Sequence, residues 1–352
     1  MNHPVILHIT EQLGIGGTEI LLKNTLPVLT EYQHVVVYLS GGDGLKESFS
    51  QYPVYCLEHT GKSTIFRSVR RLRKICKQHQ VSIVHAHLFW SSIIARLAKP
   101  ANTRLITTLH SVLSKDAFEK NKLSLWAERL TCGRQDAVIG VSAYVLRDYL
   151  QHTGYKGKTH VLYNFIPALF FKENNSSPLH SNEIKLRCIA VGNLKEVKNY
   201  PFLLAAFGGL DPGSFELDII GEGSMRPELE AAIAGKKLPV KLLGSQHDLA
   251  SLLPGYRVFI QASSYEGFGI AMAEAVAAGL IPVLSDIPVH REVTKENAYY
   301  FSLNDTGELT RLLTMISEGK ADTNKLQNCR EHIRNICSAD NYFKQLRVIY
   351  SS

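Results

Sequence analysis

The sequence predicts an α/β protein made of two doubly wound domains. Its 352 residues exceed what one hydrophobic core usually fills, so two domains of roughly 150 to 180 residues are expected. Length alone would also permit a single large α/β barrel. Short apolar segments alternate with helical segments in both halves, which favours parallel sheets covered by helices. Residues 164–183, NFIPALFFKENNSSPLHSNE, are rich in Asn, Ser and Pro without sustained periodicity, so we expect the linker there.

The predicted elements follow from hydrophobic periodicity. Short apolar runs predict strands in the first half at residues 5–9, 35–39, 83–85 and 105–108, with helices near 18–29, 65–79 and 91–98. The same patterns predict strands in the second half at residues 186–191, 216–220, 240–242, 258–261 and 281–284. Residues 341–350 predict a terminal helix with one apolar face, formed by Tyr342, Phe343, Leu346, Ile349 and Tyr350.

The composition is that of a soluble globular enzyme, with 45% hydrophobic and 20% charged residues. The N-terminus, MNHPVILHIT, lacks the features of a signal peptide, and no apolar stretch approaches the roughly 18 residues of a membrane span. We therefore expect a cytoplasmic protein. The scattered cysteines favour reduced packing residues over a metal site: Cys56, Cys76, Cys132, Cys188, Cys329 and Cys337.

The net charge of +7 is concentrated in residues 59–115, which contain eleven Lys and Arg residues and no Asp or Glu. The predicted helix at 65–79 carries six of these cations beside its apolar face: Arg67, Arg70, Arg71, Arg73, Lys74 and Lys77. A solubilising helix face is one interpretation. We favour peripheral attachment to the anionic inner face of the cytoplasmic membrane. A nucleic acid partner is not expected, because no aromatic platform or binding motif accompanies the charge.

Two glycine-containing segments near the N-terminus imitate nucleotide-binding motifs. Gly14, Gly16 and Gly17 follow the first strand, but Glu19 occupies the third glycine position of a dinucleotide fingerprint. The segment TGKST at 60–64 copies the end of a P-loop, but Cys56 stands where the leading glycine belongs. We expect neither a nicotinamide cofactor nor a P-loop.

Three histidines lie near strand ends in the first half. His85 and His87 fall on one face of a strand end, and His110 ends the next strand. They allow three interpretations: a zinc site, donors to a sugar hydroxyl or phosphate, or structural histidines. We favour sugar or phosphate donors, because no carboxylate and no thiol except Cys76, within a predicted helix, lies between His59 and Lys115. The chain also contains no Asp-x-Asp motif, so we expect no metal.

The second half carries the residues that favour a nucleotide. Lys195 and Lys198 form a cationic corner after the strand at 186–191, and Gly221 lets the backbone approach a flat ligand. In EGFGIAMAEA, residues 266–275, a helix begins near Ile270, and its first amides favour a diphosphate: Gly269, Ile270 and Ala271. Glu274, one turn inside the helix, can accept hydrogen bonds from two ribose hydroxyls, and Glu266 can face the group on the phosphates. The alternative is that one glutamate stabilises the helix dipole and the other is exposed.

The whole chain resembles the retaining GT-B glycosyltransferases of family 4, the glycosyl transferases group 1 type. The resemblance rests on GGTE at 16–19, His110 in TLHS, VGNLKEVKN at 191–199, GEGSMRPELE at 221–230 and EGFGIAMAEA at 266–275. It implies two Rossmann-like domains facing each other across a cleft. Residues 1–168 and a helix at about 338–352 would form the acceptor side, and residues 185–337 would hold the nucleotide sugar.

The resemblance implies roles for matching residues and a metal-independent, retaining transfer without a cofactor. Glu274 would bind the donor ribose, Glu266 would face the sugar and phosphates, and Lys198 would neutralise the diphosphate. His110 would reach the donor sugar, and the Gly16–Gly17 turn would approach the phosphates.

One departure from the family pattern affects the phosphate site. Asn193 stands where the family commonly has arginine, so Lys195 compensates or phosphate binding is weaker. We expect a UDP-sugar or GDP-sugar donor and a glycan or lipid-linked acceptor, with His85 and His87 on the acceptor side. The alternative enzyme is a nucleotide-sugar epimerase of the same fold.

Overall fold

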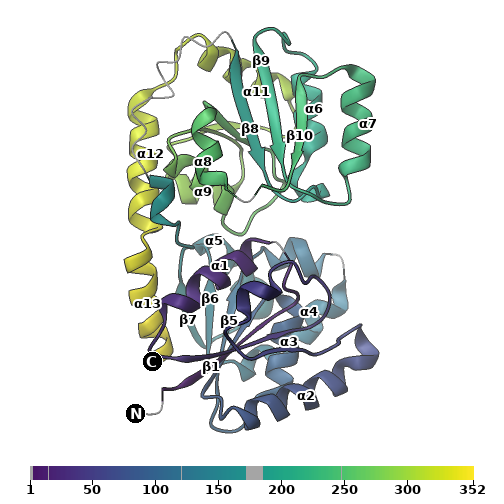
Figure 1. Ribbon diagram of the computed structural model, residues 1–352, viewed down its shortest axis with the longest axis vertical. Helices are drawn as coiled ribbons and strands as arrows, with labels where there is room; N and C mark the ends of the chain where they lie inside the picture. The colour runs from purple at the N-terminus through teal and green to yellow at the C-terminus, as the bar shows by residue number, and fades with distance from the viewer. Residues whose placement is uncertain (1–2, 15, 120, 172–184, 247) are drawn as a thin grey trace. The chain divides into compact units, whose positions relative to one another are not determined.

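The computed structural model describes residues 3–14, 16–119, 121–171, 185–246 and 248–352. The chain forms two compact units (Figure 1). Unit 1 comprises Met1–Asn164 and Asp340–Ser352, and unit 2 comprises Phe165–Ala339. Most of the linker predicted at 164–183 lies outside the described residues. Within the described ranges, no helix is both long and apolar enough to cross a membrane.

Unit 1 contains a parallel sheet with the strand order β3-β2-β1-β4-β5-β6-β7. Its strands are β1 (Val5–Thr10), β2 (Gln33–Tyr38), β3 (Val54–Cys56), β4 (Ile83–His87), β5 (Arg104–Leu109), β6 (Ala137–Gly140) and β7 (Lys158–Val161). Its main helices are α1 (Gly17–Thr25), α2 (Ile65–Gln78), α3 (Phe89–Ala98), α4 (Lys122–Thr131), α5 (Ala143–Thr153) and α13 (Ala339–Ser351).

The helices of unit 1 pack by the apolar faces that their sequences provide. In α2, Val69, Leu72 and Ile75 are buried in one core cluster with residues of the sheet. Helix α3 contacts both α2 and α4, so these three helices form one layer beside the sheet (Figure 1). Helix α1 ends at Thr25, earlier than predicted, and Leu26–Val28 continue as a 3-10 turn around Pro27.

Unit 2 contains a parallel sheet with the order β10-β9-β8-β11-β12-β13. Its strands are β8 (Leu186–Val191), β9 (Phe215–Ile220), β10 (Val240–Gly244), β11 (Val258–Gln261), β12 (Ile281–Ser285) and β13 (Tyr299–Phe301). Its helices are α6 (Tyr200–Phe207), α7 (Arg226–Lys236), α8 (Leu249–Leu252), α9 (Ile270–Ala277), α10 (Pro288–Thr294), α11 (Thr306–Ser317) and α12 (Thr323–Ile336).

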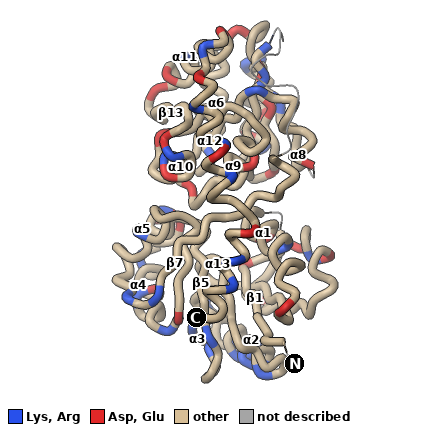
Figure 2. The backbone as a smooth tube through the Cα atoms, turned by 90° about the vertical axis from the view of Figure 1, so that its left-hand side faces the viewer, with Lys and Arg blue, Asp and Glu red and all other residues tan. Residues whose placement is uncertain are grey.

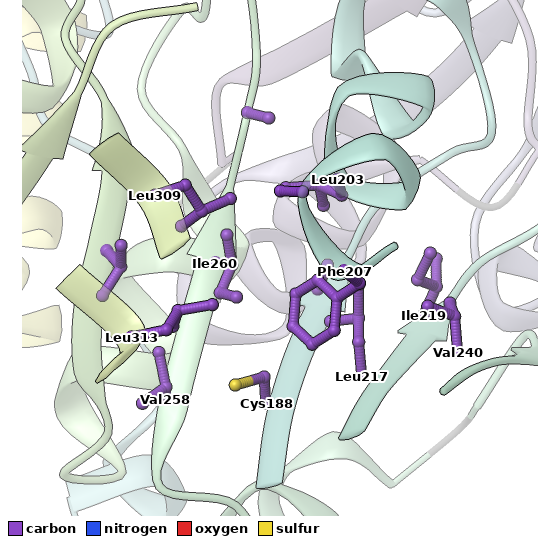
Figure 3. Packing of buried hydrophobic residues seen from close by; sticks show 14 of the residues in the cluster. Cys188, Leu203, Phe207, Leu217, Ile219, Val240, Val258, Ile260, Leu309 and Leu313 are labelled. Atoms are coloured by element: carbon purple, nitrogen blue, oxygen red, sulfur yellow. The ribbon is translucent and has the colours of Figure 1, made fainter. Parts of the chain in front are cut away.

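The core of unit 2 fixes the sheet that carries the second-half motifs. Phe207 of α6 packs over Leu217 and Cys188, and Leu309 and Leu313 of α11 lie near Ile260 and Val258 (Figure 3). These side chains are essentially fully buried, so β8, β9 and β11 are held rigidly. Strand order changes direction between β8 and β11, and ligands of such sheets bind beyond the carboxyl ends of the strands at this point.

Candidate functional site

The loops after β8 and β11 bring together two predicted site residues. Lys198 lies in the 3-10 turn Glu196–Lys198 after β8, and Glu266 lies in the loop between β11 and α9. The Nζ of Lys198 donates to the carboxylate of Glu266 at 2.6 Å. A backbone hydrogen bond from Ser264 to Val197 joins the two loops at 2.9 Å. The structure therefore places Lys198 and Glu266, the first glutamate of EGFGIAMAEA, in direct contact.

The carboxylate of Glu266 is the centre of a polar cluster. Its Oε1 accepts hydrogen bonds from Lys198, from the Ser263 hydroxyl at 2.6 Å and from the Gln261 amide at 2.5 Å. Burial alone would raise the pKa of Glu266, but the Lys198 ammonium and the Ser263 hydrogen bond outweigh it. The net pKa lies below its ordinary value, so Glu266 is an anion and a hydrogen-bond acceptor rather than an acid.

His290 belongs to the same cluster, although the sequence analysis missed it. It lies on α10 just after β12 and is fully buried, and its Nδ1 is 2.8 Å from the carbonyl oxygen of Ser285. This contact makes Nδ1 the donor, so Nε2 is the acceptor nitrogen, and it has no partner among the described residues. The signal that could have found His290 is its place in a loop-to-helix turn directly after a central strand.

The N-terminus of α9 has the geometry expected for binding an anion. Gly269 precedes the helix with φ +88°, a conformation that favours glycine, and no described side chain caps the helix. The amides of Ile270 and Ala271 therefore lie at the positive end of the helix dipole without an intrahelical acceptor.

Glu274 follows Ile270 by four residues and lies on the same face of the helix. No hydrogen bond to its carboxylate is present among the described residues. Burial raises the pKa of Glu274 to about 7.

Three further residues of unit 2 were predicted to bind the nucleotide sugar: Gly221, Asn193 and Lys195. A Cβ atom on Gly221 would lie 2.0 Å from the carbonyl oxygen of Gly192, and Gly221 has φ +142°. Contact between the loops after β8 and β9 therefore already requires this glycine, whether or not a ligand approaches it. Asn193 and Lys195 are exposed, whereas Lys198 is partly buried against Glu266.

The predicted histidines of unit 1 are parts of a larger buried cluster. The Nδ1 of His87 lies 3.1 Å from the Nε2 of His110, and the rings of His85 and His87 are 4.2 Å apart. His8 of β1, which the sequence did not single out, stacks on His87. The Nε2 of His8 lies 3.2 Å from the Nδ1 of His34. Burial lowers the pKa of all five histidines, and that of His110 to about 4, so the cluster is neutral.

The cluster meets only part of the requirement for a metal site. His8, His85 and His87 each offer a nitrogen within 4.8 Å of the others. The Nδ1 of His8 and the Nε2 of His87 have no partner among the described residues. However, both nitrogens of His85 are engaged, by Tyr350 and Thr108 at 2.7 Å each. A metal would need a third ligand, so His85 would have to release one of these hydrogen bonds.

The GGTE segment of unit 1 holds a buried carboxylate. Glu19 is 3% exposed and accepts a hydrogen bond from Thr10 at 3.2 Å. A Cβ atom on Gly16 would lie 2.5 Å from the Oε2 of Glu19, so the glycine makes room for this side chain. Nearby, Glu11 accepts a hydrogen bond from the backbone of Trp90, and burial raises its pKa.

Some cations of α2 have polar or acidic partners, although the sequence block that contains them has no acidic residue. Glu58, the residue immediately before the block, lies 3.1 Å from Arg71 and 3.9 Å from Arg67. Arg73 donates to the carbonyl oxygens of Leu97 and Ala98 at the end of α3. Arg70, Lys74 and Lys77 remain exposed along the helix, where Figure 2 shows basic residues gathered.

Comparison with known proteins identifies relatives of both units. A family model described as Glycosyltransferase Family 4 matches residues 15–168, and one described as Glycosyl transferases group 1 matches residues 171–335. N-acetyl-alpha-D-glucosaminyl L-malate synthase of Bacillus anthracis is 22% identical over 359 residues, which cover 97% of this chain and 91% of that protein.

Two further comparisons concern a shorter segment and a solved structure. The GDP-mannose:cellobiosyl-diphosphopolyprenol alpha-mannosyltransferase of Xanthomonas oryzae pv. oryzae is 36% identical over 78 residues, 22% of this chain and 20% of that protein. The crystal structure of Anabaena HepE in complex with UDP-glucose matches with a TM-score of 0.86 and 19% identity, covering 99% of this chain and 100% of that one. The structural match concerns the fold.

Proposed function

Because this chain belongs to the glycosyltransferases of family 4 and has their GT-B fold, we propose that it transfers a sugar from a nucleoside diphosphate sugar to a glycan or lipid-linked acceptor, with retained anomeric configuration. The observation that carries this proposal is the contact between Lys198 and Glu266. Glu266 lies three residues before Gly269, which precedes the uncapped start of α9. A cation, free helix amides and a carboxylate acceptor are the groups that a nucleoside diphosphate sugar requires.

Each group has a separate task in the proposed reaction. Lys198 and the amides of Ile270 and Ala271 stabilise the negative charge of the leaving diphosphate. Glu266 accepts hydrogen bonds from hydroxyls of the donor sugar, because its pKa is lowered and it remains an anion. Glu274 accepts hydrogen bonds from the ribose hydroxyls.

The proposed bond changes need no divalent cation and no enzyme nucleophile. The bond between the anomeric carbon and the diphosphate oxygen breaks, and the acceptor hydroxyl oxygen bonds to that carbon on the same face. The proton of the acceptor hydroxyl passes to the leaving diphosphate oxygen.

The histidine cluster of unit 1 supports a role for His110 at the sugar. His110 keeps partial solvent contact, whereas His85 and His87 are buried. The Nε2 of His110 faces His87, which fixes the ring and directs Nδ1 away from that pair. We assign His110 to a contact with the donor sugar. His85 and His87 would act on the acceptor side by positioning the His110 ring, because both nitrogens of His85 are already hydrogen-bonded within unit 1.

The names of two comparison proteins support the substrate classes. HepE was crystallised with UDP-glucose, and the Xanthomonas enzyme is named for GDP-mannose and a polyprenol-linked acceptor. For this chain we propose a UDP-sugar or GDP-sugar donor and an acceptor of the cell envelope. The enzyme would act at the cytoplasmic side of the membrane as a peripheral protein, attracted by the free cations of α2.

A thermal-shift and product assay tests the function. UDP, GDP and ADP are compared, and one of them should raise the melting temperature because it binds the folded state. Lys198→Ala should abolish that shift, while the control Lys236→Ala, an exposed lysine at the end of α7, should retain it. The nucleoside diphosphate should then be released from the matching donor only with an acceptor or water. Conversion of the donor sugar without release would identify an epimerase, and no shift with any nucleotide would contradict the donor site.

A further inference from the structure

Helix α4 of unit 1 exposes a stripe of large apolar side chains. Leu123 and Trp126 are each 62% exposed, and Leu130 is 77% exposed. Their spacing of three and four residues places them on one face of the helix. The other exposed residues of α4 are Lys122 and Arg129, so its outer surface consists only of apolar and cationic side chains. We call these five residues the α4 face.

The one acidic residue of α4 contributes no charge to this face. Glu128 is fully buried, and its carboxylate pairs with Arg96 at 2.7 Å and accepts a hydrogen bond from Tyr149 at 2.7 Å. Ser124 and Thr131 are also buried, so the acid and the uncharged hydroxyl side chains of the helix face inward, and only its two cations face outward. This order is the reverse of an ordinary surface helix, whose polar residues face the solvent.

We propose that the α4 face inserts into the interfacial region of an anionic lipid bilayer. Helices that lie in this region combine tryptophan and leucine with lysine and arginine, because the apolar side chains enter the acyl boundary while the cations contact anionic headgroups. The charge of the α4 face is complementary to such headgroups. Helix α3 contacts both α4 and α2, so the exposed cations Arg70, Lys74 and Lys77 belong to the same helix layer (Figure 2).

A second copy of the chain fits this face less well than a bilayer does. A symmetric contact would place Lys122 and Arg129 of one copy against the same surface of the other, with no acid on that surface to compensate. A stable interface buries roughly 800 Å² per partner. Helix α4 has only ten residues and is about 15 Å long, so its exposed face is too small to supply that area. A bilayer requires neither an opposing acid from the protein nor a large preformed area.

Insertion of the α4 face involves different residues and a different force from the cationic attraction proposed for α2. Attraction by exposed charges is screened by salt, whereas insertion of apolar side chains is much less affected. Binding to lipid is measured without donor or acceptor, so its outcome is independent of the proposed sugar transfer.

Vesicle sedimentation at low and high salt separates the two forces. The full chain is mixed with phosphatidylcholine vesicles with and without phosphatidylglycerol. We expect it to bind the anionic vesicles, with a fraction that persists in high salt. Trp126→Gln with Leu130→Gln should lower the partition coefficient at high salt by at least about tenfold. Arg70→Gln with Lys74→Gln and Lys77→Gln should remove mainly the salt-sensitive part, and the control Val348→Gln, also exposed, should bind as the wild type does.

Fluorescence provides a second measurement that needs no change in α4. The chain has two tryptophans, so Trp90→Phe leaves Trp126 as the reporter. Brominated anionic lipid should quench Trp126 and shift its emission to shorter wavelength. The proposal is wrong if the wild type binds no anionic vesicles at low salt, or if Trp126 is not quenched in bound protein. It is also overturned if the wild type sediments as a dimer that the Trp126 and Leu130 substitutions make monomeric.

Discussion

Replacing Glu274 with glutamine should stabilise the nucleotide-free protein at alkaline pH. The folded-state pKa of Glu274 is raised from 4.5 to about 7 by burial. A carboxyl with a raised pKa contributes stability that is present below its unfolded pKa and lost as pH rises through the folded pKa. The rise from 4.5 to about 7 is about 2.5 pKa units, and each unit corresponds to about 1.4 kcal/mol, so ionised Glu274 destabilises the fold by at most about 3.5 kcal/mol. Its remaining solvent contact reduces this value to roughly 1.5 to 3 kcal/mol.

Calorimetry of the wild type and Glu274→Gln checks this magnitude. For a unit of this size, 1 kcal/mol shifts the melting temperature by about 2 to 4 °C, so the variant should melt roughly 3 to 12 °C higher at about pH 8. The difference should vanish below about pH 4, where the wild-type carboxyl is protonated in both the folded and the unfolded chain. Taking the difference between two proteins cancels the titration of all other groups. The control Glu228→Gln, an exposed glutamate of α7, measures what the loss of an exposed carboxylate does to the melting temperature.

The same substitution should have the opposite effect on donor binding. Ribose hydroxyls donate to the ionised form of Glu274, so the wild type should bind the nucleoside diphosphate sugar more tightly as pH rises through about 7. Glu274→Gln should weaken binding by about 1.5 to 3 kcal/mol at alkaline pH and remove this dependence. Titration calorimetry at several pH values measures both effects. A variant that is more stable yet binds the donor normally would refute the ribose assignment, and an unchanged melting difference across pH would refute the burial argument.

Four further predictions concern the two units. Glu266→Gln should mainly lower kcat, since its anionic acceptor is lost while Lys198 keeps its charge; unchanged turnover would contradict this role. Asn193→Arg should be tolerated and bind the diphosphate at least as tightly, and a large loss of affinity would show that this exposed loop is built differently. Activity should survive exhaustive chelation, whereas a loss restored by zinc would identify the histidine cluster as a ligand set. Finally, burial lowers the pKa of four histidines: His8, His85, His87 and His110. Their contribution to the free energy of unfolding is therefore complete above about pH 6.5 and is lost as pH falls. The loss is at most about 1.4 kcal/mol per pH unit for each histidine. Urea unfolding followed by tryptophan fluorescence, which reports unit 1, should show this loss, and a midpoint that is constant from about pH 7 to 5 would contradict it.

The two sheets and most of their central strands could be predicted because apolar runs mark buried parallel strands. Strands β8 and β11 have the predicted limits. Strands β3, β6, β7 and β13 were missed; each has three or four residues, too few to show a period, although β11 is equally short. Strand β7 also begins with exposed Lys158 and Thr159, which is typical of a sheet edge and resembles a loop in sequence.

The sequence identified individual site residues better than the contacts between them. Lys198 and Glu266 were each predicted, but they are 68 residues apart, and no local pattern indicates that they form an ion pair. His8 was missed because one histidine within VILHIT reads as part of an apolar strand, and only the sheet places it beside His87. Glu58 was missed as a partner of Arg71 because it lies one residue outside the acid-free block.

The division of unit 1 into two chain segments has a consequence for the order of folding during synthesis. Helix α13 binds its sheet through Tyr350, whose hydroxyl contacts His85, and through Arg104, which donates to the carbonyl oxygens of Ile349 and Tyr350. The ribosome must add all of Phe165–Ala339 before it makes this helix. At about 5 to 20 residues per second, those 175 residues take roughly 10 to 35 s. During that interval the nascent first segment presents the surface that α13 later covers, so unit 2 can complete its fold before unit 1, contrary to the usual vectorial order from N-terminus to C-terminus.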